Sequence, residues 1–133
     1  MTIAPLTTTT SVFVDDQHRA RDFYTRLLGY VIRADIPLGE HHWLTVGLPD
    51  GAPSQDLSLE PNEHPQAQAL QKALREEGIP FFSIGVADVT SAVEQLRADG
   101  VEIVQDVTDL GPVSVAIIDD TVGNLVQLAQ LTN

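Results

Sequence analysis

The sequence contains no cysteine and few basic residues. Without cysteine, a disulfide framework, a thiolate nucleophile and a Cys-ligated zinc site are excluded. Lys and Arg number 7 and Asp and Glu number 19, so the formal net charge is −12 at pH 7. Because such a surface repels phosphate backbones, we expect no nucleic-acid partner. The charge would favour a cationic ligand, and the alternative is that it serves solubility alone.

Long apolar runs are also missing. No stretch approaches the ~18 apolar residues that a bilayer-spanning helix needs, so we expect no membrane partner. The first ten residues contain no Lys or Arg, whereas a secretory signal has a basic start and a longer apolar core. We therefore expect a cytoplasmic location. Apolar residues make up 43% of the 133 residues, which suits one packed domain or two small halves that share a core.

The first half of the sequence has the pattern of a strand, a helix and three more strands. In the expected strand 8–14, Val12 and Val14 alternate with other residues, and Asp16 is a good N-cap for a helix over 17–28. Apolar side chains recur at helical spacing in that helix, and Gly29 ends it. The rest of this half is expected to contain strands at 30–34, 41–46 and 56–60, with a turn at 49–53.

The second half repeats this order. A strand is expected at 81–86, Asp88 caps the next helix, Gly100 closes it, and three strands follow at 101–107, 113–118 and 125–130. Val14, Asp16, Ala20 and Tyr24 match Val86, Asp88, Ala92 and Leu96 at a constant offset, and Gly29 matches Gly100 with one residue fewer. A shared offset of this kind indicates an internal repeat. The alternative is two ordinary β-α-β segments of similar length.

A further helix is expected between the halves, over residues 65–77, because a narrow apolar stripe there ends at Gly78. The predicted organisation is therefore a single domain, residues 1–133. It contains a first βαβββ module at 7–61, a linker helix region at 62–79 and a second βαβββ module at 80–131. The predicted fold class is α+β.

Three motifs carry a resemblance to a known family. The segments 13–16, 23–24 and 28–30 are similar to the opening of vicinal-oxygen-chelate (VOC) modules, and 86–89 is similar to a second opening. The segment 119–128 resembles that family's closing hairpin, normally Asp-Pro-x-Gly-Asn followed by an apolar strand. The chain thus resembles the VOC superfamily, which includes glyoxalase I, bleomycin-resistance proteins and extradiol dioxygenases. The resemblance implies a curved, barrel-like mixed sheet in which tandem modules enclose a cup-shaped cavity, and it implies a homodimer.

The resemblance also implies where a metal would be bound in metal-using relatives. The glyoxalase I ligand positions fall on Thr9, Ser58, Phe81 and Gln127, and only Gln127 offers a credible ligand atom. We therefore expect no metal cofactor. The alternative is a divalent metal ion held by His42, Glu60 and Gln127. His41 and His42 are adjacent on one strand and point to opposite faces, so both cannot bind one ion from that strand.

The cavity should be lined by residues that share one face of each strand. These are expected to be Thr9, Ser11, Phe13, one of His42 and Trp43, Ser58, Glu60, Phe81, Ser83 and Gln127. Such a lining combines apolar walls with a few polar groups and suits an organic molecule. The alternative for Phe13, Trp43 and Phe81 is plain core packing.

Three functions remain open at this point, and no catalytic residue is assigned. The first is a metal-free protein that binds a small cationic or aromatic molecule, as the resemblance to bleomycin-resistance proteins implies. The second is a divergent metal-dependent lyase, isomerase or dioxygenase acting on a substrate with vicinal oxygens. The third is a non-catalytic dimeric scaffold, since fold does not determine function.

Overall fold

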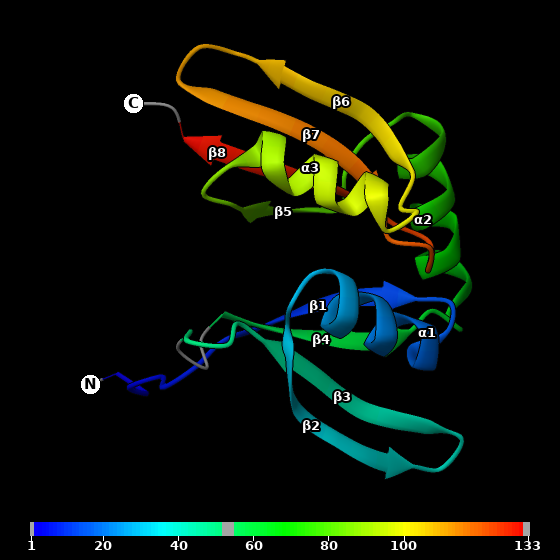
Figure 1. Ribbon diagram of the computed structural model, residues 1–133. Helices are drawn as coiled ribbons and strands as arrows, with labels where there is room; N and C mark the ends of the chain where they lie inside the picture. The colour runs from blue at the N-terminus through cyan, green and yellow to red at the C-terminus, as the bar shows by residue number, and fades with distance from the viewer. Residues whose placement is uncertain (1, 52–54, 132–133) are drawn as a thin grey trace. The chain divides into compact units, whose positions relative to one another are not determined.

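The computed structural model describes residues 2–51 and 55–131, which form two compact units, Met1–Glu63 and His64–Asn133 (Figure 1). The predicted turn at 49–53 lies partly outside the described residues. The first unit consists of β1 (Thr9–Val14), α1 (Gln17–Asp22), η1 (Phe23–Leu27), β2 (Val31–Leu38), β3 (His41–Gly47) and β4 (Asp56–Pro61). The second consists of α2 (Pro65–Glu76), β5 (Phe82–Gly85), α3 (Val89–Ala98), β6 (Ile103–Asp109), β7 (Val113–Asp119) and β8 (Leu125–Leu131).

The two units have the same sheet topology. The strand order is β1-β4-β3-β2 in the first sheet and β5-β8-β7-β6 in the second. In each sheet the first strand runs parallel to the last, and the other pairs are antiparallel. This agreement confirms the predicted α+β fold of tandem βαβββ modules, each with a curved, mixed four-stranded sheet.

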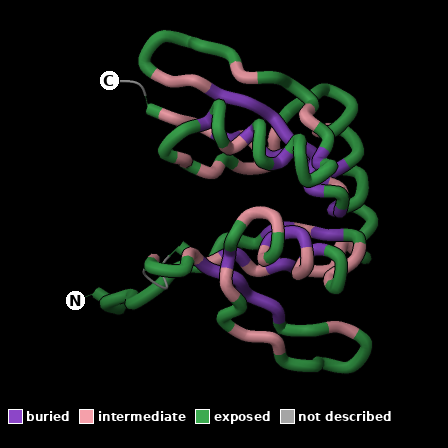
Figure 2. The backbone as a smooth tube through the Cα atoms, viewed as in Figure 1, coloured by how far each residue is buried: buried purple, intermediate pink, exposed green. Residues whose placement is uncertain are grey.

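The core of each unit lies between its helix and one face of its sheet (Figure 2). In the first unit, alternate residues of the strands are buried, among them Val12, Leu44 and Leu59, together with Ala20 and Tyr24 from the helical segment. Alternation arises because successive strand residues point to opposite faces. The opposite face of the first sheet therefore carries the residues between these core positions.

The first helix differs from the prediction of one continuous α-helix over 17–28. Regular α-helix ends at Asp22, and Phe23–Leu27 form a π-helical turn in which Leu28 N donates to Phe23 O at 3.3 Å. This segment has one residue more between its capping Asp and its closing Gly than the matching segment of the second unit. A π-turn absorbs one extra residue while both ends keep their places. Gly29 then adopts φ +83°, and Gly100 adopts φ +86°.

Strand bounds also differ from the prediction, by one residue in most strands and by more in β2 and β6. β2 continues past the expected end at residue 34 to Leu38 and includes Pro37. Proline is tolerated here because β2 lies at the edge of its sheet and needs no hydrogen bond on its outer side. β6 begins and ends two residues later than expected, and its pairing with β7 has register shifts. β5 begins at Phe82 rather than Phe81, although Phe81 N still donates to Leu125 O at 2.8 Å.

The helix α2 belongs to the second unit and packs against its closing turn. Gln71 Nε2 donates to Asn124 Oδ1 at 3.1 Å, and Arg75 forms an ion pair with Asp119. Gly123 permits this packing, since a Cβ there would lie 2.7 Å from Gln71 Nε2. None of the helices in residues 2–51 and 55–131 has the length and apolarity that crossing a membrane requires.

Candidate functional site

The face of the first sheet opposite the helix, hereafter the open face, brings together five of the predicted site residues. Sheet register determines the set: Ser11 pairs with Ser58, and Ser58 pairs with Thr45. Residues two positions along each strand share the same face. The open face therefore carries Ser11, Phe13, Trp43, Ser58 and Glu60. Thr9 has the same parity and is the exposed first residue of β1.

The centre of the open face combines a carboxylate with aromatic surface. Ser11 Oγ donates to Glu60 Oε2 at 2.5 Å, which fixes the orientation of that carboxylate. Trp43 and Glu60 each lie two residues from the Thr45–Ser58 pair, in the same direction across two antiparallel strands. The Trp43 side chain is 56% exposed, so its indole is available for contact. An exposed indole and a carboxylate on one sheet face can together take a flat, positively charged molecule.

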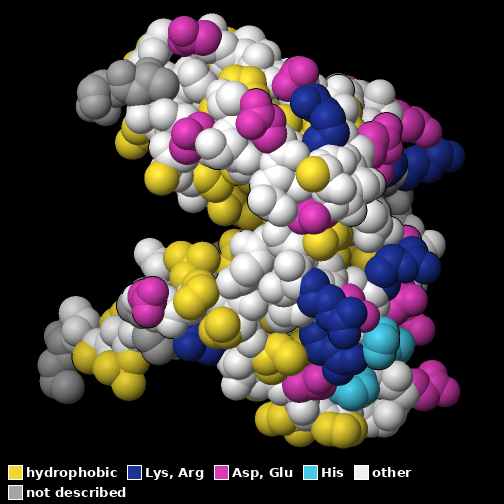
Figure 3. Space-filling view, in the orientation of Figure 1, with side chains coloured by type: hydrophobic (Ala, Val, Ile, Leu, Met, Phe, Trp, Pro, Cys, Tyr) yellow, Lys and Arg dark blue, Asp and Glu magenta, His cyan; other side chains and the backbone are white. Residues whose placement is uncertain are grey.

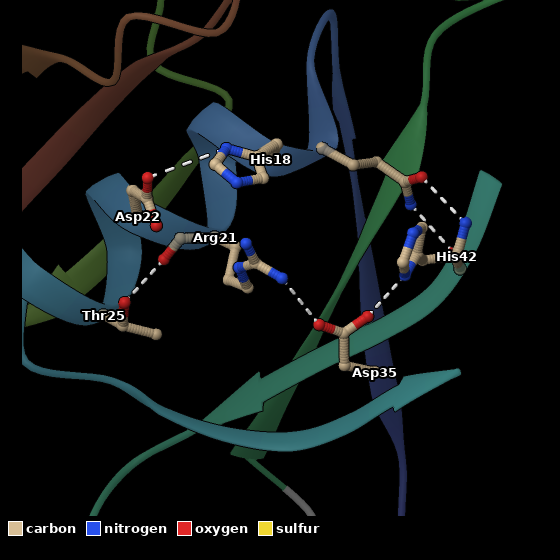
Figure 4. Close-up of polar contacts among 7 residues, drawn as sticks. His18, Arg21, Asp22, Thr25, Asp35 and His42 are labelled. Atoms are coloured by element: carbon tan, nitrogen blue, oxygen red, sulfur yellow. Dashed lines mark hydrogen bonds and ion pairs between the residues drawn. The ribbon is translucent and has the colours of Figure 1, made fainter. Parts of the chain in front are cut away.

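His42 lies on the other face of the sheet. The sequence left open whether His42 or Trp43 would line the predicted cavity, and the register places Trp43 on the open face and His42 on the helix side. His42 Nδ1 lies 2.5 Å from Asp35 Oδ1, and Arg21 Nη1 donates to Asp35 Oδ2 at 2.8 Å (Figure 4). His42 is thus separated from Glu60 by the sheet itself. His41 Nε2 lies 2.8 Å from Glu63 Oε1.

Asp35 is the centre of this polar network. The Arg21 guanidinium, and secondly His42, hold the pKa of the Asp35 carboxyl below its usual range by hydrogen bonding to the charged form. Gln17 fixes the backbone of His42 from the helix, since its Nε2 donates to His42 O at 2.8 Å and its Oε1 accepts from His42 N at 3.0 Å. Figure 4 shows Asp35 lying between Arg21 and His42.

Sequence reasoning missed Gln17, Arg21 and Asp35. The signal that could have found Asp35 is the hairpin of β2 and β3, which turns at Gly39 and Glu40. It pairs Asp35 with Leu44, which lies two residues from His42 on the same face of β3. That register was hidden because the strand was expected to end before Pro37.

The second unit places its predicted site residues on the corresponding face of its own sheet. Ser83 pairs with Gln127, and Gln127 Nε2 donates to Ser83 Oγ at 2.9 Å. Gln127 also pairs with Ile117 of β7, which is buried. Phe81 is half-buried in the bend before β5. Each unit therefore links the serine of its first strand to a polar side chain of its last strand.

The side chains present do not fit a divalent metal ion. The positions where the resemblance implies ligands hold two neutral hydroxyls, a hydrocarbon ring and one amide, at Thr9, Ser58, Phe81 and Gln127. Of the alternative ligands, His42 and Glu60 lie on opposite faces of one sheet. Across the described part of the chain, no group of three or more His, Cys, Asp and Glu residues is placed to hold a metal ion.

Comparison with known proteins places the chain in a family. The chain is 43% identical over 121 residues to the uncharacterized protein YurT of Bacillus subtilis (strain 168), an alignment that covers 91% of this chain and 95% of that protein. The crystal structure of UcmS2 superposes with a TM-score of 0.79 at 27% identity, covering 96% of this chain and 98% of that one.

A second solved structure is similar over its whole length. TnmS3, described as an antibiotic binding protein from Streptomyces sp. CB03234, superposes with a TM-score of 0.76 at 25% identity, covering 99% of this chain and 100% of that one. Residues 5–128 match the sequence profile of the Glyoxalase/Bleomycin resistance protein/Dioxygenase superfamily. With its repeated βαβββ units and a profile match over nearly its whole length, the chain belongs to the Glyoxalase/Bleomycin resistance protein/Dioxygenase superfamily.

Proposed function

We propose that this protein binds a small organic molecule that has both a flat aromatic surface and a positive charge, and that it does so without a metal ion. The observation that carries the proposal is the exposed Trp43 on the same sheet face as the Ser11–Glu60 hydrogen bond. In this proposal the open face of the first sheet is the recognition surface.

Aromatic contact would supply most of the affinity. Trp43 is 56% exposed and its cross-strand partner Ile36 is 53% exposed, so two large apolar side chains meet solvent on one face. Phe13 is half-buried on the same face, beside Glu60 in the β1–β4 register. Apolar side chains that meet solvent together are typical of binding surfaces, and stacking on a bound ring would remove this area from water.

The carboxylate of Glu60 would select for charge. Ser11 holds it in place, so a bound cation would meet an oriented partner that loses little freedom on binding. The net charge of −12 adds a long-range attraction for cations. The likeness to TnmS3, which is described as antibiotic binding, supports a small-molecule ligand. In the second unit, the Gln127–Ser83 hydrogen bond stands where the first unit has the Ser11–Glu60 bond, with a neutral amide in place of the carboxylate.

Isothermal titration calorimetry with matched ligands tests the proposal. The probes are bleomycin, doxorubicin, and doxorubicinone, which keeps the aromatic core of doxorubicin and lacks its amino sugar. We expect doxorubicin to bind more tightly than doxorubicinone. Trp43→Ala should weaken both by about tenfold, a typical cost of truncating an aromatic anchor. Glu60→Gln should weaken the binding of doxorubicin, which carries the amine, and should leave the binding of doxorubicinone unchanged.

The matched control is His42→Gln, which changes a polar residue of the same strand on the opposite face. It should leave the affinity for doxorubicin unchanged. Absence of heat for all three probes would refute the proposal, as would equal affinities of Trp43→Ala and the parent protein. A homodimer and a cytoplasmic location stay predictions from the sequence.

A further inference from the structure

The first unit contains a cavity that is separate from the open face. It has a volume of about 350 Å³ and lies on the helix side of the sheet, between α1 and the ends of β2, β3 and β4. Small-molecule sites have volumes of about 300 to 1,000 Å³, so this cavity lies at the lower end of that range. Figure 3 shows histidine, arginine and acidic side chains gathered on the face of this unit that carries α1.

The wall of this cavity is fixed by the network around His42. Gln17 hydrogen-bonds to the His42 backbone and also donates to Leu59 O at 2.8 Å. Asp35 orients the His42 ring. Arg21 holds Asp35 from α1. A wall whose rotamers are locked in this way is preorganised for a ligand, since little side-chain freedom remains to be lost. The buried Val14 and Leu44 supply apolar lining beside it.

The second unit has the same backbone arrangement but carries apolar residues at the positions that form this polar wall. At the constant offset between the repeats, Gln17 corresponds to Val89 and Arg21 corresponds to Val93. Both valines are only 1% exposed and form part of the core. Polar side chains in the first unit thus replace the apolar side chains that close the helix–sheet contact in the second. The replacement is a feature of one unit and is not required by the fold.

Charge defines the class of ligand. Five acidic residues and one arginine are among the residues that line the cavity. Asp35 and Glu63 are already partnered by Arg21, His42 and His41. The side-chain carboxylates of Asp15 and Glu40 have no hydrogen bond or ion pair among the described residues. Both residues line the cavity and are exposed, so their carboxylates are the groups that an incoming ammonium can neutralise.

We propose that this cavity is a second binding site, for a small linear aliphatic polyamine. Its ammonium groups would bind Asp15 and Glu40, and its methylene segments would lie in the cavity between them. The Gln17–His42–Asp35–Arg21 network holds the wall in place and does not itself pair with the ammonium groups of the ligand. The site lies on the opposite face of the sheet from Trp43, so it is independent of the open face and of its ligand.

Calorimetric titration with spermidine tests this site. The test variant is the double substitution Asp15→Asn/Glu40→Gln, and the control is Glu76→Gln/Glu94→Gln, which removes the same charge from exposed helix surfaces of the second unit. We expect the test variant to weaken spermidine binding by about tenfold and the control by less than about twofold. The reason is that a direct contact between an ammonium and a carboxylate is strong, whereas the attraction from distant charges is screened by salt. Butylamine, with one ammonium, should bind more weakly than spermidine.

Equal weakening by the two double variants would overturn the proposal, because the protein's net charge alone would then account for the binding. Absence of spermidine binding in the parent protein would overturn it as well. Trp43→Ala should leave the spermidine affinity unchanged while it weakens the binding of doxorubicin and doxorubicinone. The two proposals can therefore fail separately.

Discussion

The helices of the two units begin in the same way and then bury different side chains. Asp16 accepts a hydrogen bond from Arg19 N at 2.9 Å, and Asp88 accepts one from Ser91 N at 3.0 Å, so both helices have the same N-cap. After the cap, the first unit presents polar residues to its sheet where the second presents valine. Caps and apolar stripes therefore determine the course of the backbone, while a few helix positions can carry either core residues or the polar residues of a site.

The second unit should not tolerate the first unit's arginine at the matching helix position. Val93→Arg places an unpartnered guanidinium at a position that is 1% exposed. We expect the free energy of unfolding to fall by about 4 kcal/mol, since burying an unpaired charge is among the costliest single changes. Urea denaturation followed by far-UV circular dichroism measures the effect.

The unique tryptophan gives this experiment a built-in reference. Trp43 lies in the first unit, so its fluorescence reports unfolding there, while circular dichroism reports both units. We expect the loss for Val93→Arg to appear mainly in the circular dichroism curve. A loss of unfolding free energy under about 1 kcal/mol would mean that the arginine side chain can reach solvent from this position, and that the position is not sealed in the core.

The closing turns of the two units should also differ in how much their aspartates stabilise the fold. Asp120 of the second unit is 0% exposed, and its carboxylate accepts hydrogen bonds from Val122 N at 3.0 Å and from Asn124 N and Nδ2 at 2.9 and 2.8 Å. Asp120→Ala leaves these donors unpaired, and we expect a loss of about 3 kcal/mol. In the first unit, Asp50 is exposed, and Asp50→Ala should change the urea midpoint very little. Similar losses for both variants would contradict the expectation.

Most of the fold could be predicted because its signals are local. N-caps, helical stripes and closing glycines each depend on a few neighbouring residues. Because the chain contains a repeat, each of these patterns occurs in both halves of the sequence. The π-helical turn at Phe23–Leu27 could not be predicted, although its cause, one extra residue before Gly29, is visible in the sequence. A single insertion can be absorbed by a longer loop or by a wider helical turn, and only packing decides between them.

The site was less predictable because it depends on register. Adjacent strand residues point to opposite faces, so a shift of one residue exchanges His42 and Trp43. The pairing of Thr45 with Ser58 decides between them, and that contact is not local. The Asp35–His42 contact has the same origin, since it depends on where the hairpin of β2 and β3 turns. The wall of the cavity beside α1 depends on this contact, and no motif in the sequence indicated the cavity on its own.

The smallest expected effect comes from the reverse exchange, Arg21→Val, which gives the first unit the second unit's residue. Because the Arg21–Asp35 pair is partly exposed, we expect a loss of only about 1 kcal/mol at pH 7. The Asp35 pKa is lowered in the folded protein, so this pair stabilises the fold above the unfolded-state pKa and loses its effect as the pH falls through the lowered value. The stability difference between parent and variant should therefore be largest near neutral pH and should close in acid. Urea denaturation from pH 7 to pH 3, together with an NMR titration of the Asp35 carboxyl carbon, measures both quantities. A stability gap that stays constant over this range would show that Arg21 stabilises the unit through packing of its methylene groups and not through charge.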